Sequence, residues 1–159
     1  MEHSTSVRAF DVPLMPKKRP RVVTIGGVNK PRRHMAYMPP DYVDWKAQIG
    51  LLVGTIPDQL GVRFRFELPA SWSRSKQLAM IWQPHVVRPD LDNLVGALMD
   101  ACKAKDQTIH QVVMSKVYAP TTGFDVWDVT IDGYAPRNLD AVGDSARMFE
   151  SRMSADCPF

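Results

Sequence analysis

The clearest alternation of apolar and polar residues in this chain lies in VRFRFEL, at residues 62–68. Val62 and every second residue after it are apolar, and the residues between them are charged. A period of two residues is typical of a strand with one buried face. We expect this strand to pair with a second one as an antiparallel ribbon. Apolar runs bounded by turn residues predict that second strand at residues 78–84, and three others at 10–16, 111–119 and 124–132.

Two other segments repeat their apolar residues at spacings of three and four, the period of an amphipathic helix. The first covers residues 41–53 and follows Pro39 and Pro40, which are typical of a helix start. The second covers residues 92–103, where Asp92 or Asn93 can cap the helix. Its apolar face consists of Leu94, Ala97, Leu98 and Ala101.

The order β-α-β-β-α-β-β of these elements predicts an α+β fold. We expect a small, mostly antiparallel mixed sheet packed with two helices, in a single domain over residues 1–134. Residues 17–36 are rich in proline and glycine, which predicts a loop or a loose hairpin. Residues 135–159 are polar with scattered apolar positions, and they predict a tail or a weak terminal helix.

Composition places the chain among globular proteins. Its 159 residues are 45% apolar, which suffices for one core. No apolar run is long enough to span a bilayer, and the first residues lack the pattern of a signal peptide. Cys102 and Cys157 fit neither a disulfide framework nor a zinc site, so we expect free thiols. These features predict a cytoplasmic protein with no membrane partner.

Positive charge is concentrated near the N-terminus. The first 36 residues carry a net charge of +6, and the rest of the chain carries −3. Lysine and arginine neutralise phosphates, so this basic arm (residues 17–36) favours a nucleic-acid partner. A solvated loop that aids solubility explains the same composition equally well.

Carboxylates gather around the start of the second predicted helix. Asp90 and Asp92 lie two residues apart, and Asp100 and Asp106 follow. In an extended chain, residues two apart project to the same side, and crowded like charges favour a bound cation. Because Mg²⁺ and Mn²⁺ prefer oxygen ligands, we expect Asp90, Asp92 and Asp106 to bind one of them, with Asp100 as a further candidate. The alternative is that these acids only cap the helix and interact with its dipole.

Several motifs occur in an order that matches a known family. PKKRPRV (16–22) and YMPPDYVDWK (37–46) come first, and Arg88-Pro89 then leads into Asp90-Leu91-Asp92-Asn93-Leu94. Met99-Asp100-Ala101 and the acidic turn at residues 106–109 follow. Over roughly residues 11–132 the chain thus resembles the RusA family of Holliday-junction resolvases, the crossover-junction endodeoxyribonucleases of phages and prophages.

The resemblance implies a homodimeric α+β nuclease that binds four-way DNA junctions and resolves them by paired symmetric nicks with Mg²⁺ or Mn²⁺. It implies a role in recombination and repair, in a bacterial or phage-infected cell. The catalytic residues carried over from the family are Asp90, Asp92 and Asp106.

The chain departs from the family pattern at two positions. Gly96 stands where the family usually has a lysine, four residues after the second aspartate. Lys105-Asp106 stands where the family often has two aspartates, and Lys103 or Lys105 can supply the missing positive charge from nearby. We therefore include Lys105 among the catalytic candidates.

Basic side chains are expected to bind DNA phosphates, which positions the DNA without reading its bases. The candidates are Lys17, Lys18, Arg19, Arg21, Lys30, Arg32, Arg33 and Arg88. Two other functions fit the sequence. A protein of the same fold that binds junctions without cutting them is favoured by Gly96. A protein-interaction module would use the acidic segment to bind a basic partner.

Overall fold

The computed structural model describes residues 7–26, 32–102 and 108–129. The predicted tail at 135–159, and with it the domain end at residue 134, lies outside the described residues. The chain divides into two units. A sheet unit takes in Met1–Leu14, Pro57–Arg88 and Ile109–Phe159, and a helical unit takes in Met15–Ile56 and Pro89–Thr108.

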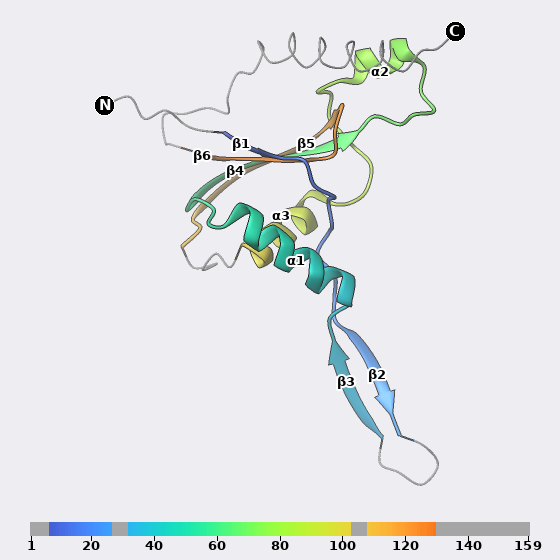
Figure 1. Ribbon diagram of the computed structural model, residues 1–159, viewed down its shortest axis with the longest axis vertical. Coiled ribbons are helices and arrows are strands. Elements are labelled where there is room, and N and C mark those ends of the chain that lie inside the picture. Colours follow the sequence, from blue (N-terminus) through green and yellow to red (C-terminus); the bar gives the residue numbers. More distant parts are fainter. Residues whose placement is uncertain (1–6, 27–31, 103–107, 130–159) are drawn as a thin grey trace. The chain divides into compact units, whose positions relative to one another are not determined.

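A four-stranded mixed sheet dominates the sheet unit. β5 runs parallel to β4, whereas the other neighbouring strands are antiparallel. The predicted α+β class with a mostly antiparallel mixed sheet is therefore confirmed. The strands are β1 (Arg8–Phe10), β4 (Gln59–Glu67), β5 (Gln111–Ala119) and β6 (Gly123–Asp128), in the order β1-β6-β4-β5 (Figure 1).

β4 has the two-residue period that the sequence predicted. Its side chains at Val62 and Phe64 are buried, and they lie opposite Val126 and Phe124 of β6. The rings of Phe64 and Phe124 have centroids 6.2 Å apart. These pairs belong to the apolar core of the sheet unit, because cross-strand partners project to the same face.

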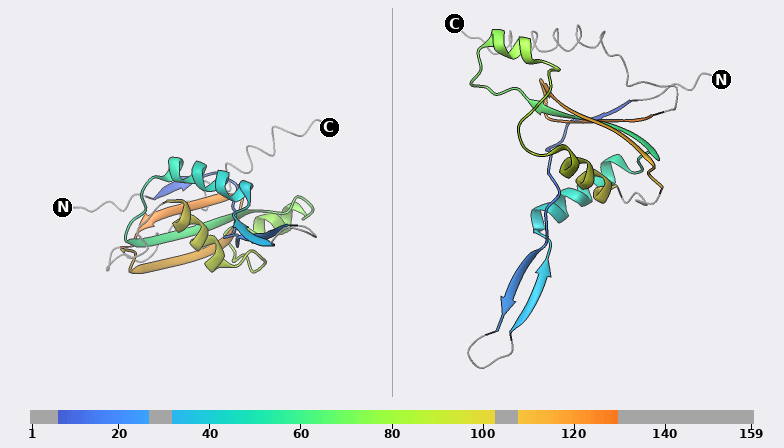
Figure 2. Two further views of the ribbon diagram at one scale, coloured as in Figure 1. Left: turned by 90° about the horizontal axis from the view of Figure 1, so that it is seen from below. Right: turned by 180° about the vertical axis from the view of Figure 1, so that it is seen from behind.

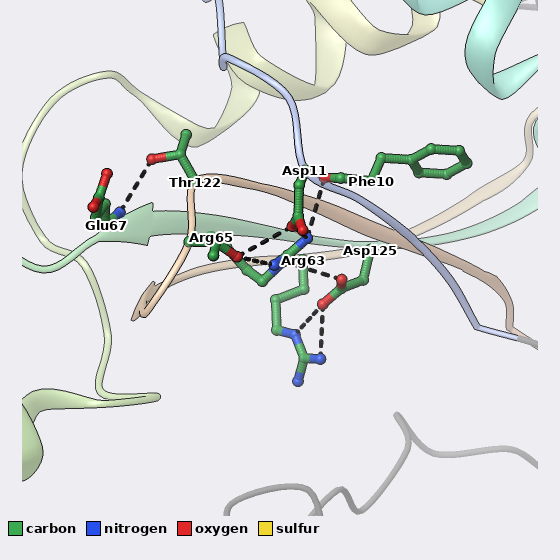
Figure 3. A network of polar contacts seen from close by, with 8 residues as sticks. Phe10, Asp11, Arg63, Arg65, Glu67, Thr122 and Asp125 are labelled. Atoms are coloured by element: carbon green, nitrogen blue, oxygen red, sulfur yellow. Dashed lines mark hydrogen bonds and ion pairs between the residues drawn. The ribbon is translucent and has the colours of Figure 1, made fainter. Parts of the chain in front are cut away.

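The alternate residues of β4 carry a network of ion pairs (Figure 3). Arg63 donates from Nε to Asp125 at 2.8 Å, and Arg65 lies 3.1 Å from the other oxygen of the same buried carboxylate. Arg65 also contacts Asp11 at 2.8 Å and donates to the Thr121 hydroxyl at 2.7 Å. A buried carboxylate needs such partners, and here they link β4 to β6 and to the chain that follows β1.

The predicted strand at 78–84 is wrong, and the described part of the chain contains three helices where the sequence predicted two. α2 (Arg74–Met80) takes the first part of that run, and its N-cap Ser73 accepts a hydrogen bond from the Lys76 amide. The remainder lies along β5 and not along β4: the Trp82 amide donates to the Tyr118 carbonyl at 2.8 Å. Five to seven apolar residues do not distinguish a short helix from a strand by periodicity.

The predicted strand at 10–16 is displaced, since β1 ends at Phe10. Pro13 and Pro16 occupy the expected strand. Proline has no amide hydrogen to donate to a sheet, which explains why pairing stops before them.

Two helices and a hairpin make up the helical unit. Its elements are β2 (Arg21–Ile25), β3 (Arg33–Tyr37), α1 (Pro40–Val53) and α3 (Leu91–Ala101). α1 and α3 approach closely, because a Cβ on Gly50 would lie only 2.6 Å from the Ala101 carbonyl oxygen. β2 and β3 pair antiparallel, so the basic arm is a hairpin (Figures 1 and 2). Both helices and the hairpin agree with the sequence-based expectation.

His85 is buried against the aromatic ring of Phe66, with ring centroids 4.1 Å apart. Burial, and then the positive charge of Lys116, lowers the pKa of His85 below its ordinary value. A histidine with a lowered pKa stabilises the fold above its unfolded-state pKa, near 6.5. That stability is lost as the pH falls through this value, since the unfolded chain binds the proton more readily.

We therefore predict that the free energy of unfolding falls between about pH 7.5 and about pH 5.5 by more in the wild type than in His85→Phe. Phenylalanine keeps the stacked ring on Phe66 and does not titrate. Urea unfolding of both proteins at the two pH values measures the difference. Equal losses would show that His85 does not contribute to the pH dependence.

Candidate active site

Asp90 and Asp92 lie at the N-terminal end of α3. Asp90 occupies the N-cap position, but its side chain makes no capping hydrogen bond, and Asp92 lies in the first turn. Both residues are exposed. Within the described residues neither carboxylate has an ion-pair partner. Side-chain capping therefore does not account for Asp90, and both carboxylates are available to a ligand.

The helix begins at Leu91, one residue before the predicted start. The expectation that Asp90 and Asp92 project to one side of an extended chain therefore does not apply. Both residues instead share the N-terminal end of α3, Asp90 at the N-cap position and Asp92 in the first turn.

Asp100 has other partners. The Lys17 ammonium lies 3.2 Å from its carboxylate, and the Tyr42 hydroxyl donates to it at 3.2 Å. Burial, and then the charge of Asp100, raises the pKa of Tyr42, so the hydroxyl stays protonated and donates. Asp100 lies eight residues after Asp92, about 12 Å along the helix. The structure therefore does not bring Asp100 together with Asp90 and Asp92.

Lys17 runs along α3. Its amide donates to the Asn93 carbonyl at 2.9 Å, and its ammonium reaches Asp100. Between these points its Cδ lies 3.3 Å from where a Cβ on Gly96 would be. The position where the resemblance implies a lysine is thus crossed by the side chain of a different lysine. Sequence patterns did not indicate this, because Lys17 and Asp100 are 83 residues apart.

The remaining basic candidates fall into three groups. Lys18 is paired with Asp41, and this hydrogen bond lowers the pKa of the Asp41 carboxyl. Lys30, Lys105 and Asp106 lie outside the described residues. Arg19, Arg21, Arg32, Arg33 and Arg88 are exposed, and within the described part of the chain they have no ion-pair partner.

The hairpin presents two different faces. Register places Arg21 opposite Tyr37 and Ile25 opposite Arg33, so both arginines lie on one face. On the other face Thr24 and His34 are hydrogen-bonded at 3.1 Å. Two positive charges thus mark the ends of a single face of the basic arm.

Residues 7–26, 32–102 and 108–129 contain no group of three histidine, cysteine or acidic side chains placed to hold a metal ion. The same ranges contain no helix that is long and apolar enough to cross a membrane. Of the predicted metal ligands, only Asp90 and Asp92 are therefore both described and available.

A family model described as endodeoxyribonuclease RusA matches residues 11–127. The chain belongs to the RusA endodeoxyribonuclease family. The match includes the whole basic arm, α1, α3 and most of the sheet. No curated protein and no solved structure matched the chain. Membership in the RusA family assigns the chain to the endodeoxyribonucleases, and the acidic end of α3 is its candidate active site.

Proposed function

We propose that this protein is a metal-dependent, structure-selective endodeoxyribonuclease that binds four-way DNA junctions and resolves them by paired symmetric nicks. The observation that carries the proposal is that Asp90 and Asp92 are exposed at the start of α3 and have no ion-pair partner among the described residues, in a chain of the RusA family. In this proposal the enzyme acts as a homodimer, because a two-fold pair presents equivalent sites to the two strands.

Asp90 and Asp92 would hold Mg²⁺ or Mn²⁺, with Asp106 as a third ligand. The two described carboxylates fit such an ion, because they offer only hard oxygen donors and neither is paired with a cationic side chain in residues 7–26, 32–102 and 108–129. When bound, the ion lowers the pKa of a water and stabilises the charge that develops on the scissile phosphate. Lys105 would add positive charge beside Asp106.

The chain's own residues bind and orient the DNA. Lys17 and Lys18 are engaged by Asp100 and Asp41, so we assign the phosphate contacts chiefly to the exposed arginines. In-line attack by water on the phosphate, oriented by these contacts, leaves a 5′-phosphate and a 3′-hydroxyl. Junction preference then comes from the shape of the DNA. The arginines concerned are Arg19, Arg21, Arg32 and Arg33.

Cleavage of a labelled four-way junction tests the function directly. The wild type should nick the junction with Mg²⁺ or Mn²⁺, nick a linear duplex of the same sequence much less, and be inactive with a chelator. A protein that binds the junction but never nicks it would be the non-cleaving alternative. Gly96 favours that alternative, since the family usually has a lysine there.

The basic arm is expected to contribute affinity. Arg32→Ala with Arg33→Ala should weaken junction binding for all sequences and lower the slope of log affinity against log salt by about 2, because fewer counterions are released. Lys76→Ala, an exposed lysine on α2, is the matched control and should leave the slope unchanged. Titrations at several salt concentrations measure both. An unchanged slope in the double variant would remove the arm from the DNA interface.

A further inference from the structure

β5 lies at one edge of the four-stranded sheet (Figure 1). Within the described residues, backbone hydrogen bonds cover only the C-terminal half of that edge. Along its C-terminal half, the Tyr118 amide donates to Gln83 at 3.0 Å, and the Lys116 carbonyl accepts from His85 at 3.0 Å. Backbone groups in a strand alternate between its two neighbours. Because residues 116 and 118 face outward, Met114 and Val112 face outward as well.

No described residue bonds to the outward backbone groups of Val112 and Met114. Their side chains and that of Val113 are 38–44% exposed. Val113 projects to one face of the sheet, and the other two project to the opposite face. The free edge therefore carries half-exposed apolar side chains on both faces, with Val113 between Gln111 and Ser115 on one face and Val112 and Met114 on the other.

Natural edge strands are commonly protected by charges, prolines, bulges or a covering segment. The free stretch Gln111–Ser115 contains no charge and no proline, whereas the covered half contains Lys116. A partner that packs on one face would leave the other face exposed. Another strand added at the edge continues both faces at once and satisfies the backbone groups.

We propose that Gln111–Ser115 is the dimer interface, where β5 pairs antiparallel with β5 of a second copy about a two-fold axis at Val113. In this register each Val112 lies opposite the second copy's Met114, and the outward groups form about four hydrogen bonds. An axis at Met114 would place Val112 opposite the partner's Lys116, whose outward carbonyl is already bonded to His85. Antiparallel pairing of identical strands is closed by two-fold symmetry, and an uncharged stretch meets its own copy without repulsion.

The interface would explain why nicks are made in pairs, because it joins two subunits that each cut one strand. This part of the inference rests on the proposed function. A two-fold axis at β5 would join two identical subunits, and two equivalent strands of a symmetric junction require two identical subunits for paired cuts. The proposal about the surface itself depends only on β5, so the two can fail separately.

Disulfide formation tests the register. In Val113→Cys the two cysteines would be a non-hydrogen-bonded pair with Cα atoms about 4.5 Å apart, within the range that a disulfide spans. With Cys157→Ser in the background, mild oxidation should give a covalent dimer. Val112→Cys is the control within the strand. In the proposed register position 112 of each copy lies opposite Met114 of the second copy and not opposite the second position 112, so this variant should cross-link less. Val86→Cys, which is 84% exposed in a loop, is the control for random collision. Equal cross-linking of all three would overturn the register.

Val113→Lys tests the interface in solution, because it places two like charges opposite each other. Residue 113 is 39% exposed, so the monomer should still fold, as checked by circular dichroism. Light scattering should show a dimer for the wild type and a monomer for the variant. A plasmid with an extruded cruciform then reports whether nicks are paired, because two opposed nicks give a linear product and one nick gives an open circle. The wild type should give linear plasmid, and Val113→Lys should give nicked circles.

Each outcome bears on one of the two proposals. A Val113→Lys variant that stays dimeric overturns the interface. A monomeric wild type, together with a Val113→Cys variant that forms no covalent dimer, overturns it as well and leaves the edge to a strand of another protein. A monomeric variant that still linearises the cruciform overturns the link between this interface and paired cuts. Specific Val113→Cys dimers without any nicking in the wild type support the interface and contradict the proposed function.

Discussion

Asp92→Asn is expected to lower the rate of junction cleavage by at least about 100-fold, equivalent to about 2.7 kcal/mol of transition-state stabilisation, while junction binding persists. Asparagine keeps nearly the same volume, and the carboxylate of Asp92 has no ion-pair partner among the described residues, so the fold should be unchanged. The substitution removes a negative charge that an oxygen-preferring cation requires. Without metal, the variant should bind the junction at least as tightly as the wild type, because one source of repulsion from phosphate is gone.

Two measurements separate binding from chemistry. Mobility shift without metal gives the affinity, and cleavage of an end-labelled junction with Mg²⁺ or Mn²⁺ gives the rate. Asp44→Asn is the matched control, since Asp44 is an exposed aspartate of the same unit on α1, and it should cut normally. If Asp92→Asn also cuts at the wild-type rate, Asp92 interacts only with the helix dipole and the catalytic assignment is wrong.

Asp100→Asn should behave differently from Asp92→Asn. It weakens the contact with Lys17 and removes the charge beside the Tyr42 hydroxyl, but Asp100 is about 12 Å along the helix from Asp92. We expect a small loss of stability and little change in the rate of cleavage.

A different substitution is the one to try if the wild type binds junctions without cutting them. Gly96→Lys would place a lysine where the family usually has one, and the Lys17 side chain must then move aside.

Local periodicity predicted much of the fold. The boundaries of β5 coincide with the predicted strand at 111–119, and α1 begins one residue before the predicted helix. These elements are long, so their apolar repeats distinguish strand from helix. α2 was missed because it has only seven residues and follows a serine cap in a polar loop.

The candidate site was predictable only in part. The concentration of acids before an apolar helix pointed to Asp90 and Asp92, since that feature is local. The contacts of Asp100 were not predictable, because Lys17 and Tyr42 reach it from positions 83 and 58 residues away. The burial of His85 also depends on distant aromatic residues of the sheet unit.

The same substitution at two glycines is expected to change stability in opposite directions. A Cβ on Gly61 would lie 2.1 Å from the ring of Trp127, its cross-strand partner in β6, and that indole is buried. Gly61→Ala must displace the ring or bend the sheet, so we expect the free energy of unfolding to fall by about 1–3 kcal/mol. In contrast, among the described residues a Cβ on Gly96 meets only the Cδ of Lys17, at 3.3 Å.

Lys17 can yield, because its side chain is flexible and 51% exposed. Gly96→Ala should therefore stabilise α3 by about 0.5–1 kcal/mol, the advantage of alanine over glycine inside a helix. Urea unfolding of both variants and the wild type measures the two effects. A neutral Gly61→Ala would mean that the Trp127 ring is not held against β4. A destabilised Gly96→Ala would mean that Lys17 is held rigidly between Asn93 and Asp100, and that α3 requires glycine where the lysine crosses it.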